Sequence, residues 1–203
     1  MENIEKIINK NNIVCITNRK LVGTSIKDCS CFSALLEKMR EVVKMKPSFV
    51  ILREKDLSPE KYKELAMAVI EICEKAGVSC VLHYFYKEAI ELGIKKIHLP
   101  LNILESMTDN ERSFFDVIGV STHSVDDAKR AERLGASYIT AGHIFATDCK
   151  KGLAPRGIKF LKEVCESVDI DVYAIGGISE KNIDECIKAG AEGVCMMSGF
   201  MNM

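Results

Sequence analysis

The chain has 203 residues, of which 47% are hydrophobic, and its formal net charge is −1 at pH 7. This length can bury one sizeable core, and we expect a single domain over residues 1–203. Acids and bases are mixed along the chain, which excludes the concentrated basic surface that nucleic-acid binding needs. No apolar stretch approaches the roughly 20 residues of a membrane helix. Residues 1–12 carry acids without an apolar signal core, so we predict a cytoplasmic protein with no nucleic-acid or membrane partner.

The sequence predicts eight short strands from apolar runs that alternate with segments of helical periodicity. The runs are IVCIT from Ile13, FVILR from Phe49, SCVLH from Ser79, KIHLP from Lys96, DVIGVST from Asp116, YITAG from Tyr138, VYAIGG from Val172 and GVCMMS from Gly193. The clearest helical segment runs from Ser58, an expected N-cap, through Pro59 at the first helical position to Gly77. Two later segments, SVDDAKRAERLGA and SEKNIDECIKAGA, have the same arrangement, with a serine expected as the cap of each.

Strands that alternate with helices pair in parallel, because parallel neighbours need crossover connections. Eight such units in about 200 residues predict an α/β protein with a (β/α)8 barrel, the TIM barrel. An open doubly wound sheet is the alternative, which the absence of GxGxxG after the first strand disfavours. The chain ends soon after the eighth strand, so we expect the final helix to be short or absent. Either the amino-terminal segment or a partner subunit of a homo-oligomer would then cover that face.

The nine cysteines are odd in number and include no CxxC pair. Cys15, Cys80 and Cys195 lie in apolar runs, and we interpret them as buried, reduced side chains. Cys29 and Cys31 supply too few ligands for a zinc site. Cys149 lies in a polar loop, where we expect an inert thiol.

Polar residues gather at the predicted carboxyl ends of strands, where this barrel carries its catalytic groups. Arg53, Glu54 and Lys55 follow the second strand, and the four histidines are His83, His98, His123 and His143. Any one of these histidines could be a satisfied, half-buried imidazole. None of their spacings places two ligands on one element, so we expect no metal site.

Two glycine-containing strand ends predict a phosphate site. Gly176 and Gly177 end the seventh strand, and Ser198 and Gly199 end the eighth. Small residues there let backbone N–H groups approach an anion at the rim where barrels often hold phosphate. A tight turn at the glycine pair is the alternative.

Four segments together resemble the thiamine phosphate synthase superfamily: ILREKD, IGVSTHS, YITAGHIFATDCKKGLAPRG and VYAIGGIS. The resemblance implies a TIM barrel. Within the superfamily, GHIFATDCKKGL resembles the TenI branch, whose members are thiazole tautomerases. Synthases have Asn-Asp where this chain has His83-Tyr84, and a Gly-Gln-x-Asp motif where it has residues 100–103. The two missing aspartates are the family's magnesium ligands, which implies that this chain lacks the magnesium site.

The resemblance therefore implies a thiazole tautomerase, an isomerase of thiamine biosynthesis that aromatises a thiazole carboxylate ethyl phosphate without metal or redox cofactor. Such a reaction needs one group that takes and gives protons. His123 matches the family's catalytic histidine, although the residues alone do not separate it from His143. The loop over residues 142–157 would cover the site, with Thr147 and Lys150 facing the phosphorylated thiazole.

Other roles follow from the same resemblance. Arg53 and Lys55 would bind the substrate carboxylate, and Lys151 and Arg156 are either solvated charges or ligands. Two alternatives remain at this point: thiamine phosphate synthase, which joins a pyrimidine diphosphate to a thiazole phosphate, and a non-catalytic regulator that binds a phosphorylated ligand.

Overall fold

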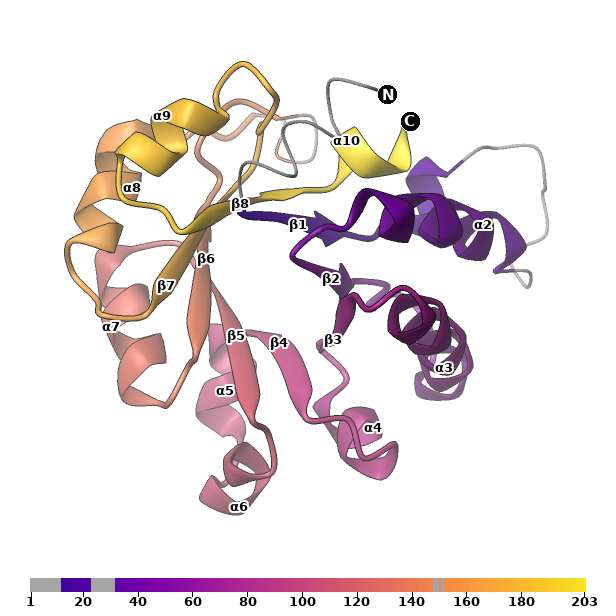
Figure 1. The fold of residues 1–203 in the computed structure, drawn as a ribbon. Helices are drawn as coiled ribbons and strands as arrows, with labels where there is room; N and C mark the ends of the chain where they lie inside the picture. Colours follow the sequence, from indigo (N-terminus) through magenta and orange to yellow (C-terminus); the bar gives the residue numbers. More distant parts are fainter. Residues whose placement is uncertain (1–11, 23–31, 148–149, 151) are drawn as a thin grey trace. The chain divides into compact units, whose positions relative to one another are not determined.

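The structure is a computed structural model, and it describes residues 12–22, 32–147, 150 and 152–203. All eight predicted strands are present, and helices separate them along the chain (Figure 1). The strands are β1 Asn12–Ile16, β2 Phe49–Leu52, β3 Ser79–His83, β4 Lys96–Pro100, β5 Val117–Thr122, β6 Tyr138–Gly142, β7 Asp171–Ile175 and β8 Gly193–Met196. Each lies within two residues of the apolar run that predicted it, because burial on both faces makes these strands nearly continuous apolar segments.

The strands form one closed barrel in chain order from β1 to β8. The pairs that join β1 to β2, β2 to β3 and β4 through β8 are all parallel. The predicted (β/α)8 fold is therefore confirmed, and the open doubly wound sheet is wrong.

The helical elements follow the strands along the chain, and the predicted serine caps are present with one exception. They are η1 Arg19–Leu21, α2 Ser33–Val42, η2 Val43–Met45, α3 Pro59–Lys75, α4 Tyr86–Glu91, α5 Leu101–Ser106, α6 Asp109–Ser113, α7 Val125–Arg133, α8 Gly157–Cys165, α9 Ile183–Lys188 and α10 Ser198–Met201. Ser58 caps α3 and Ser124 caps α7, each by accepting a hydrogen bond from the backbone N–H three residues on. α10 has four residues, so the final helix is short as predicted.

The exception is Ser179, which does not cap the helix that follows it. α9 begins four residues later, at Ile183, and its N-cap is Asn182. The Ser179 backbone N–H instead donates to Asn182 Oδ1 at 2.8 Å. The Asn182 side chain thus closes a turn over residues 179–182, and the helix begins only after this turn.

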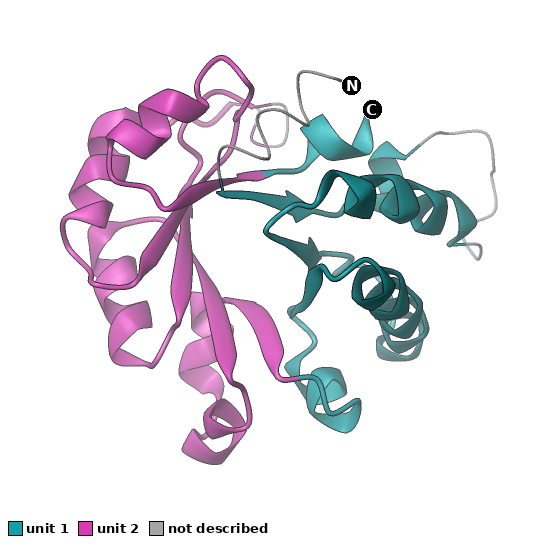
Figure 2. Cartoon of the chain, in the orientation of Figure 1, with its two compact units in different colours: residues 1–94, 196–203 teal, residues 95–195 magenta. Residues whose placement is uncertain are grey.

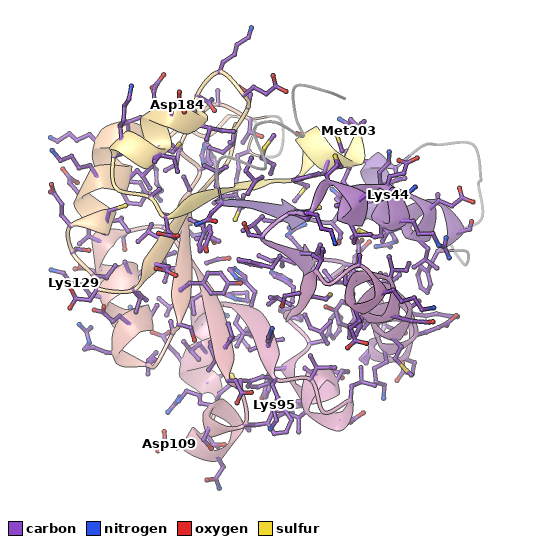
Figure 3. All side chains as sticks on the ribbon, viewed as in Figure 1. Lys44, Lys95, Asp109, Lys129, Asp184 and Met203 are labelled. Atoms are coloured by element: carbon purple, nitrogen blue, oxygen red, sulfur yellow. The ribbon has the colours of Figure 1, made fainter. Side chains whose placement is uncertain are left out.

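The chain divides into two compact units (Figure 2). Unit 1 contains residues 1–94 and 196–203, and unit 2 contains residues 95–195. Within each unit the side chains between the strands and their helices form the core, while charged residues such as Lys129 on α7 and Asp184 on α9 project outward (Figure 3). A single domain over residues 1–203 and a homo-oligomer stay predictions, and the segment expected to cover the barrel, residues 1–11, lies outside the described residues.

Among the cysteines in the described ranges, Cys15 and Cys195 are buried as expected, while Cys80 is half-buried. Burial raises the pKa of Cys195 well above its usual range, which keeps this thiol protonated and unreactive. Cys29, Cys31 and Cys149 lie outside the described part of the chain. No helix among the described residues is long and apolar enough to cross a membrane.

Candidate active site

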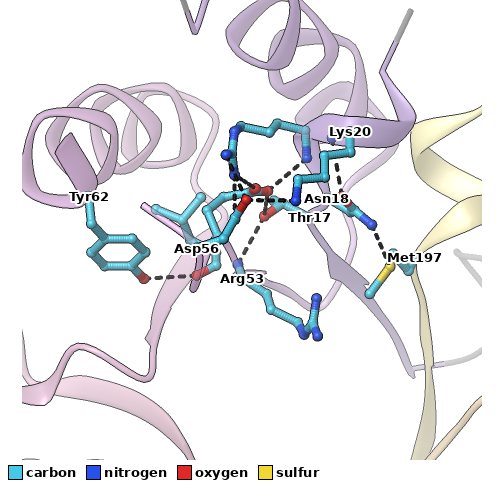
Figure 4. A network of polar contacts seen from close by, with 10 residues as sticks. Thr17, Asn18, Lys20, Arg53, Asp56, Tyr62 and Met197 are labelled. Carbon is cyan, nitrogen blue, oxygen red and sulfur yellow. Dashed lines mark hydrogen bonds and ion pairs between the residues drawn. The ribbon is translucent and has the colours of Figure 1, made fainter. Parts of the chain in front are cut away.

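The buried carboxylate of Glu54, which follows β2, is bonded to residues that follow β1 in unit 1, and Figure 4 shows the polar network around Thr17. Glu54 is 2% exposed. It accepts hydrogen bonds from Thr17 Oγ1 at 2.8 Å, from the Arg19 backbone N–H at 2.9 Å and from Arg19 Nη1 at 2.9 Å. A charge taken out of water is costly unless it is paired and hydrogen-bonded, and these contacts meet that condition. The sequence pattern singled out Glu54, but it gave no sign of its partners Thr17 and Arg19.

Asp56 extends this group of charges to the surface. Its two carboxylate oxygens accept from Arg19 Nη1 at 2.6 Å and from Arg19 Nη2 at 2.8 Å, and Lys20 Nζ lies 2.8 Å from Oδ2. The hydrogen bond from Arg19 holds the pKa of Asp56 well below its usual range, so the aspartate is ionised. Arg19 therefore pairs with both carboxylates, and Lys20 pairs with Asp56 alone among the described residues.

The predicted anion-binding cations, Arg53 and Lys55, alternate in sequence with these two acids. The Arg53 side chain extends away from the carboxylates, and its guanidinium takes part in none of the drawn contacts (Figure 4). Among the described residues, neither the Arg53 guanidinium nor the Lys55 ammonium makes a hydrogen bond or ion pair. Both cations are thus available to an anionic ligand.

His123, the predicted catalytic residue, follows β5 in unit 2 and is exposed. Its Nδ1 lies 2.9 Å from the carbonyl oxygen of Gly142, at the end of the neighbouring strand β6. Its backbone N–H donates to Asp127 Oδ2 at 3.0 Å. These contacts fix both the ring and the backbone of the residue, and they leave Nε2 for a ligand.

His98 does not lie at the strand end where the sequence placed it. It is the third of five residues in β4, and its side chain is 2% exposed. Its Nδ1 lies 3.1 Å from Tyr138 Oη, and its Nε2 lies 2.9 Å from Ser121 Oγ. Burial lowers the pKa of His98 to about 3, so the imidazole is neutral and belongs to the interior.

His143 is also mostly buried, and it anchors the long loop that we predicted to cover the active site. Its Nε2 lies 3.3 Å from the carbonyl oxygen of Leu153. The backbone N–H of Ile144 donates to the Ile175 carbonyl at 2.9 Å, and that of Phe145 donates to the Gly176 carbonyl at 3.0 Å. The start of the loop therefore extends the pairing of β6 with β7.

Further along the loop, the Lys150 backbone N–H donates to the Thr147 carbonyl at 3.1 Å. Lys150 is exposed and makes no ion pair with the described residues. The Arg156 guanidinium lies over the ring of Phe160, 5.2 Å from its centroid, and Lys151 lies outside the described residues. A role of Thr147 and Lys150 in substrate binding stays a prediction.

The backbone turn after β7 requires glycine at the two positions that were predicted to bind phosphate. Gly176 and Gly177 have φ values of 97° and 68°, in the left-handed region that favours glycine. A Cβ on Gly176 would collide with His143, and one on Gly177 would collide with the backbone of residues 145–146. The glycine pair therefore makes a tight turn, and phosphate binding at the backbone amides of this turn stays a prediction.

Asn182 closes this turn from its other side. Its Nδ2 donates to the Gly177 carbonyl at 2.9 Å, in addition to the bond that Oδ1 accepts from Ser179. Ser198 and Gly199, the other predicted phosphate ligands, begin α10 in unit 1, whereas the glycine pair lies in unit 2. Ser198 is exposed.

The residues at the family's two magnesium positions do not fit the ion. Tyr84 presents a phenol with 39% exposure, and Ile103 in α5 has no ligand atom in its side chain. Mg²⁺ prefers carboxylate and other hard oxygen ligands in octahedral geometry. No group of three or more His, Cys, Asp or Glu side chains that could hold a metal ion occurs within the described ranges. These two positions therefore offer no carboxylate to hold magnesium.

Known proteins match this chain over nearly its full length. Residues 13–200 match the family model described as thiamine monophosphate synthase. A protein of Aquifex aeolicus with a provisional thiamine-phosphate synthase name is 33% identical over 93% of this chain and 97% of its own. The thiamine-phosphate synthase of Methanobrevibacter smithii is 31% identical over 89% of this chain and 86% of its own.

A solved structure supports the same relationship. Thiamine phosphate pyrophosphorylase from Pyrococcus furiosus superposes with a TM-score of 0.77 and 25% identity, over 97% of this chain and 90% of that one. An N-acetylmannosamine-6-phosphate 2-epimerase from Clostridium perfringens has a TM-score of 0.66 at 10% identity, over 98% and 91%, which shows the fold alone.

These comparisons overturn the predicted thiazole tautomerase, because the named relatives are thiamine-phosphate synthases. They support an enzyme, but not an isomerase, and they do not distinguish the TenI branch. The prediction relied on two missing magnesium aspartates, but cations such as Arg53 and Lys55 can also neutralise a diphosphate. Since the family model covers residues 13–200, this chain belongs to the thiamine monophosphate synthase family of TIM-barrel enzymes of thiamine biosynthesis.

Proposed function

We propose that this enzyme is a thiamine-phosphate synthase, which joins a pyrimidine diphosphate to a thiazole phosphate and releases diphosphate. The similarity to thiamine-phosphate synthases across nearly the whole chain carries the proposal. The structure supports it with two cations after β2, Arg53 and Lys55, that have no acidic partner among the described residues. A cytoplasmic location accords with this small-molecule chemistry and stays a prediction.

The reaction replaces one bond at the methylene carbon of the pyrimidine. The bond from this carbon to the diphosphate oxygen breaks, and the diphosphate leaves with the electron pair. The thiazole ring nitrogen supplies the electron pair of the new C–N bond, which makes the thiazole ring cationic. The substitution needs no oxidant and no net proton transfer. The proton shuttle expected of His123 is therefore not part of this proposal.

Negative charge develops on the departing diphosphate, so groups that bind it more tightly as it leaves accelerate the reaction. Arg53 is suited to this role because a guanidinium binds two phosphate oxygens at once, and Lys55 adds a second positive charge.

The thiazole phosphate is assigned to unit 2. We place its phosphate at the backbone amides of the turn that begins with Gly176 and Gly177, which Asn182 holds in shape. Thr147 and Lys150 face the same ligand in this proposal, whereas phosphate binding by Ser198 and Gly199, which lie in unit 1, stays a separate prediction. The His123 Nε2, which the Nδ1 contact leaves available, accepts a hydrogen bond from a substrate in this proposal.

The test is direct synthesis. The protein is incubated with both substrates, with and without magnesium, and thiamine phosphate and diphosphate are measured. We expect the two products in equal amounts, and Arg53→Ala to lose turnover while Lys61→Ala, a change of an exposed lysine on α3, keeps it. No thiamine phosphate above the level of heat-inactivated protein would refute the proposed function.

A further inference from the structure

The carboxylate of Glu54 is tied to the strand before its own. Its hydrogen bonds reach Thr17 and Arg19, which follow β1, whereas Glu54 follows β2. The two residue pairs are 37 and 35 positions apart in sequence. Glu54 therefore holds together the segments that follow two neighbouring strands, at the end of the sheet where this fold carries its catalytic groups.

Thr17 passes this contact on to Arg53. The Thr17 hydroxyl donates its one proton to Glu54 Oε1, and its oxygen accepts the backbone N–H of Arg53 at 2.9 Å. Thr17 is fully buried, and so is held in one position. The backbone of Arg53 is thus connected to the Glu54 carboxylate by two successive hydrogen bonds that point the same way.

The alternation of residues 53–56 separates the charges of this segment. Glu54 and Asp56 contact Arg19, and Lys20 contacts Asp56. Arg53 extends away from these carboxylates (Figure 4), and Lys55 is exposed. Because Arg19 forms ion pairs with both Glu54 and Asp56, neither carboxylate pairs with the side chain of Arg53.

We propose that Glu54 is a positioning residue for anion binding, which acts through Thr17 to hold Arg53 and through Arg19 to keep the acids away from it. This inference deepens the proposed function and rests on it, since the anion is the diphosphate end of the pyrimidine substrate. Glu54 itself touches no substrate. Its role is to hold the Arg53 guanidinium ready for the diphosphate before the ligand arrives, which lowers the entropic cost of binding.

The direction in which diphosphate affinity changes when Glu54 loses its charge distinguishes this positioning role from a purely electrostatic effect. Removing a negative charge close to an anion site strengthens anion binding when only Coulomb forces act. Positioning predicts the reverse, because loss of the Glu54 carboxylate releases Thr17 and the Arg53 backbone. The neutral variant Glu54→Gln is nearly isosteric, and it therefore tests the two explanations against each other.

The experiment is a calorimetric titration of the full chain with inorganic diphosphate. We expect Glu54→Gln and Thr17→Val to bind diphosphate on the order of tenfold to a hundredfold more weakly, the effect of losing one hydrogen bond that involves a charged group. Thr17→Ser keeps the hydroxyl and should bind within about threefold of the parent. Glu64→Gln is the matched control, because Glu64 is an exposed glutamate that pairs with Lys61 on α3.

A double-mutant cycle with Arg53→Ala locates the effect. If Glu54 acts through Arg53, adding Glu54→Gln to Arg53→Ala weakens diphosphate binding no further. Additive losses would overturn the proposal, and so would tighter or unchanged binding in a folded Glu54→Gln variant. Should Glu54→Gln fail to fold, Thr17→Val against Thr17→Ser decides alone, with equal affinities counting against the proposal. Because the titration needs no turnover, a protein that binds diphosphate through Arg53 but makes no thiamine phosphate would refute the proposed function and leave the Glu54 role standing.

Discussion

The Nδ1 of His123 lies 2.9 Å from the carbonyl oxygen of Gly142. A carbonyl oxygen only accepts hydrogen bonds, so Nδ1 is the nitrogen that carries a proton. In the neutral imidazole this leaves Nε2 with a free lone pair. The contact arises because β5 and β6 pair in register, Thr122 opposite Ala141, which puts the next residue of each strand side by side.

We predict that the Nε2 side of His123 contributes to substrate binding. His123→Ala should lower kcat/KM by about tenfold, the effect of one lost hydrogen bond. His123→Gln, whose amide can occupy the position of Nε2, should keep more activity than His123→Asn, whose amide can replace only Nδ1. Steady-state kinetics of the three variants provide the test, with Lys129→Ala as a surface control. Full activity in the asparagine variant would remove Nε2 from the site.

The turn after β7 should tolerate no side chain at Gly177. Gly177→Ala forces a residue with a Cβ into the left-handed region, which costs about 1–2 kcal/mol, and overpacking against residues 145–146 adds about 1–3 kcal/mol. Gly135→Ala is the control, since Gly135 has a φ of 86° with open space around its Cα. Urea denaturation should show the larger loss of unfolding free energy for Gly177→Ala. Equal losses would mean that the loop yields to the extra methyl group.

Asn182 should affect one substrate and not the other. Asn182→Ala removes both bonds that shape the turn, to Gly177 and to Ser179. We expect the KM for the thiazole phosphate to rise by about tenfold, while the KM for the pyrimidine diphosphate is unchanged. The neighbouring exposed residue supplies the control, Lys181→Ala. A parallel rise of both KM values would assign Asn182 to general stability and not to the phosphate.

The buried His98 should make stability depend on pH. Its folded-state pKa is about 3, below the ordinary value of 6.5, so between these values the unfolded chain binds more protons than the folded one. Stability is therefore fully present above about pH 6.5 and is lost as the pH falls toward 3, by at most about 1.4 kcal/mol per pH unit from this group.

His98→Asn removes this titration. Urea denaturation from about pH 7 down to about pH 4 should show a shallower decline of the unfolding free energy for His98→Asn than for the parent, whereas Lys129→Gln keeps the parental slope. Identical slopes in His98→Asn and the parent would show that His98 is not the responsible group.

Chelation should leave the synthase reaction intact. Tyr84 and Ile103 occupy the positions of the family's magnesium ligands, and neither offers a carboxylate. We expect the rate in EDTA to stay within about threefold of the rate in magnesium, since the protein lacks the acids that would hold the ion. A rate that collapses in EDTA and returns with added divalent ion would show that the diphosphate needs a metal that these residues do not hold.

The sequence by itself was enough to predict all eight strands, the caps of α3 and α7 and the short last helix. These features depend on burial periodicity and on hydrogen bonds between residues three or four positions apart, which neighbouring sequence encodes. It was also enough to identify the superfamily and the two cations after β2. It misled where the two missing aspartates favoured a tautomerase over the synthase, because other charges can bind the same diphosphate.

Only the tertiary structure decided which polar groups meet. Thr17 and Glu54 are 37 positions apart, and nothing near either residue in sequence marks the other as its partner. His98 faces Tyr138 and Ser121 in the interior because its position within β4 and the pairing of neighbouring strands put it there. Gly177 is a glycine because a segment 32 positions earlier returns to pack on it. Such contacts depend on strand register and on the close packing of distant segments, which short-range sequence patterns do not specify.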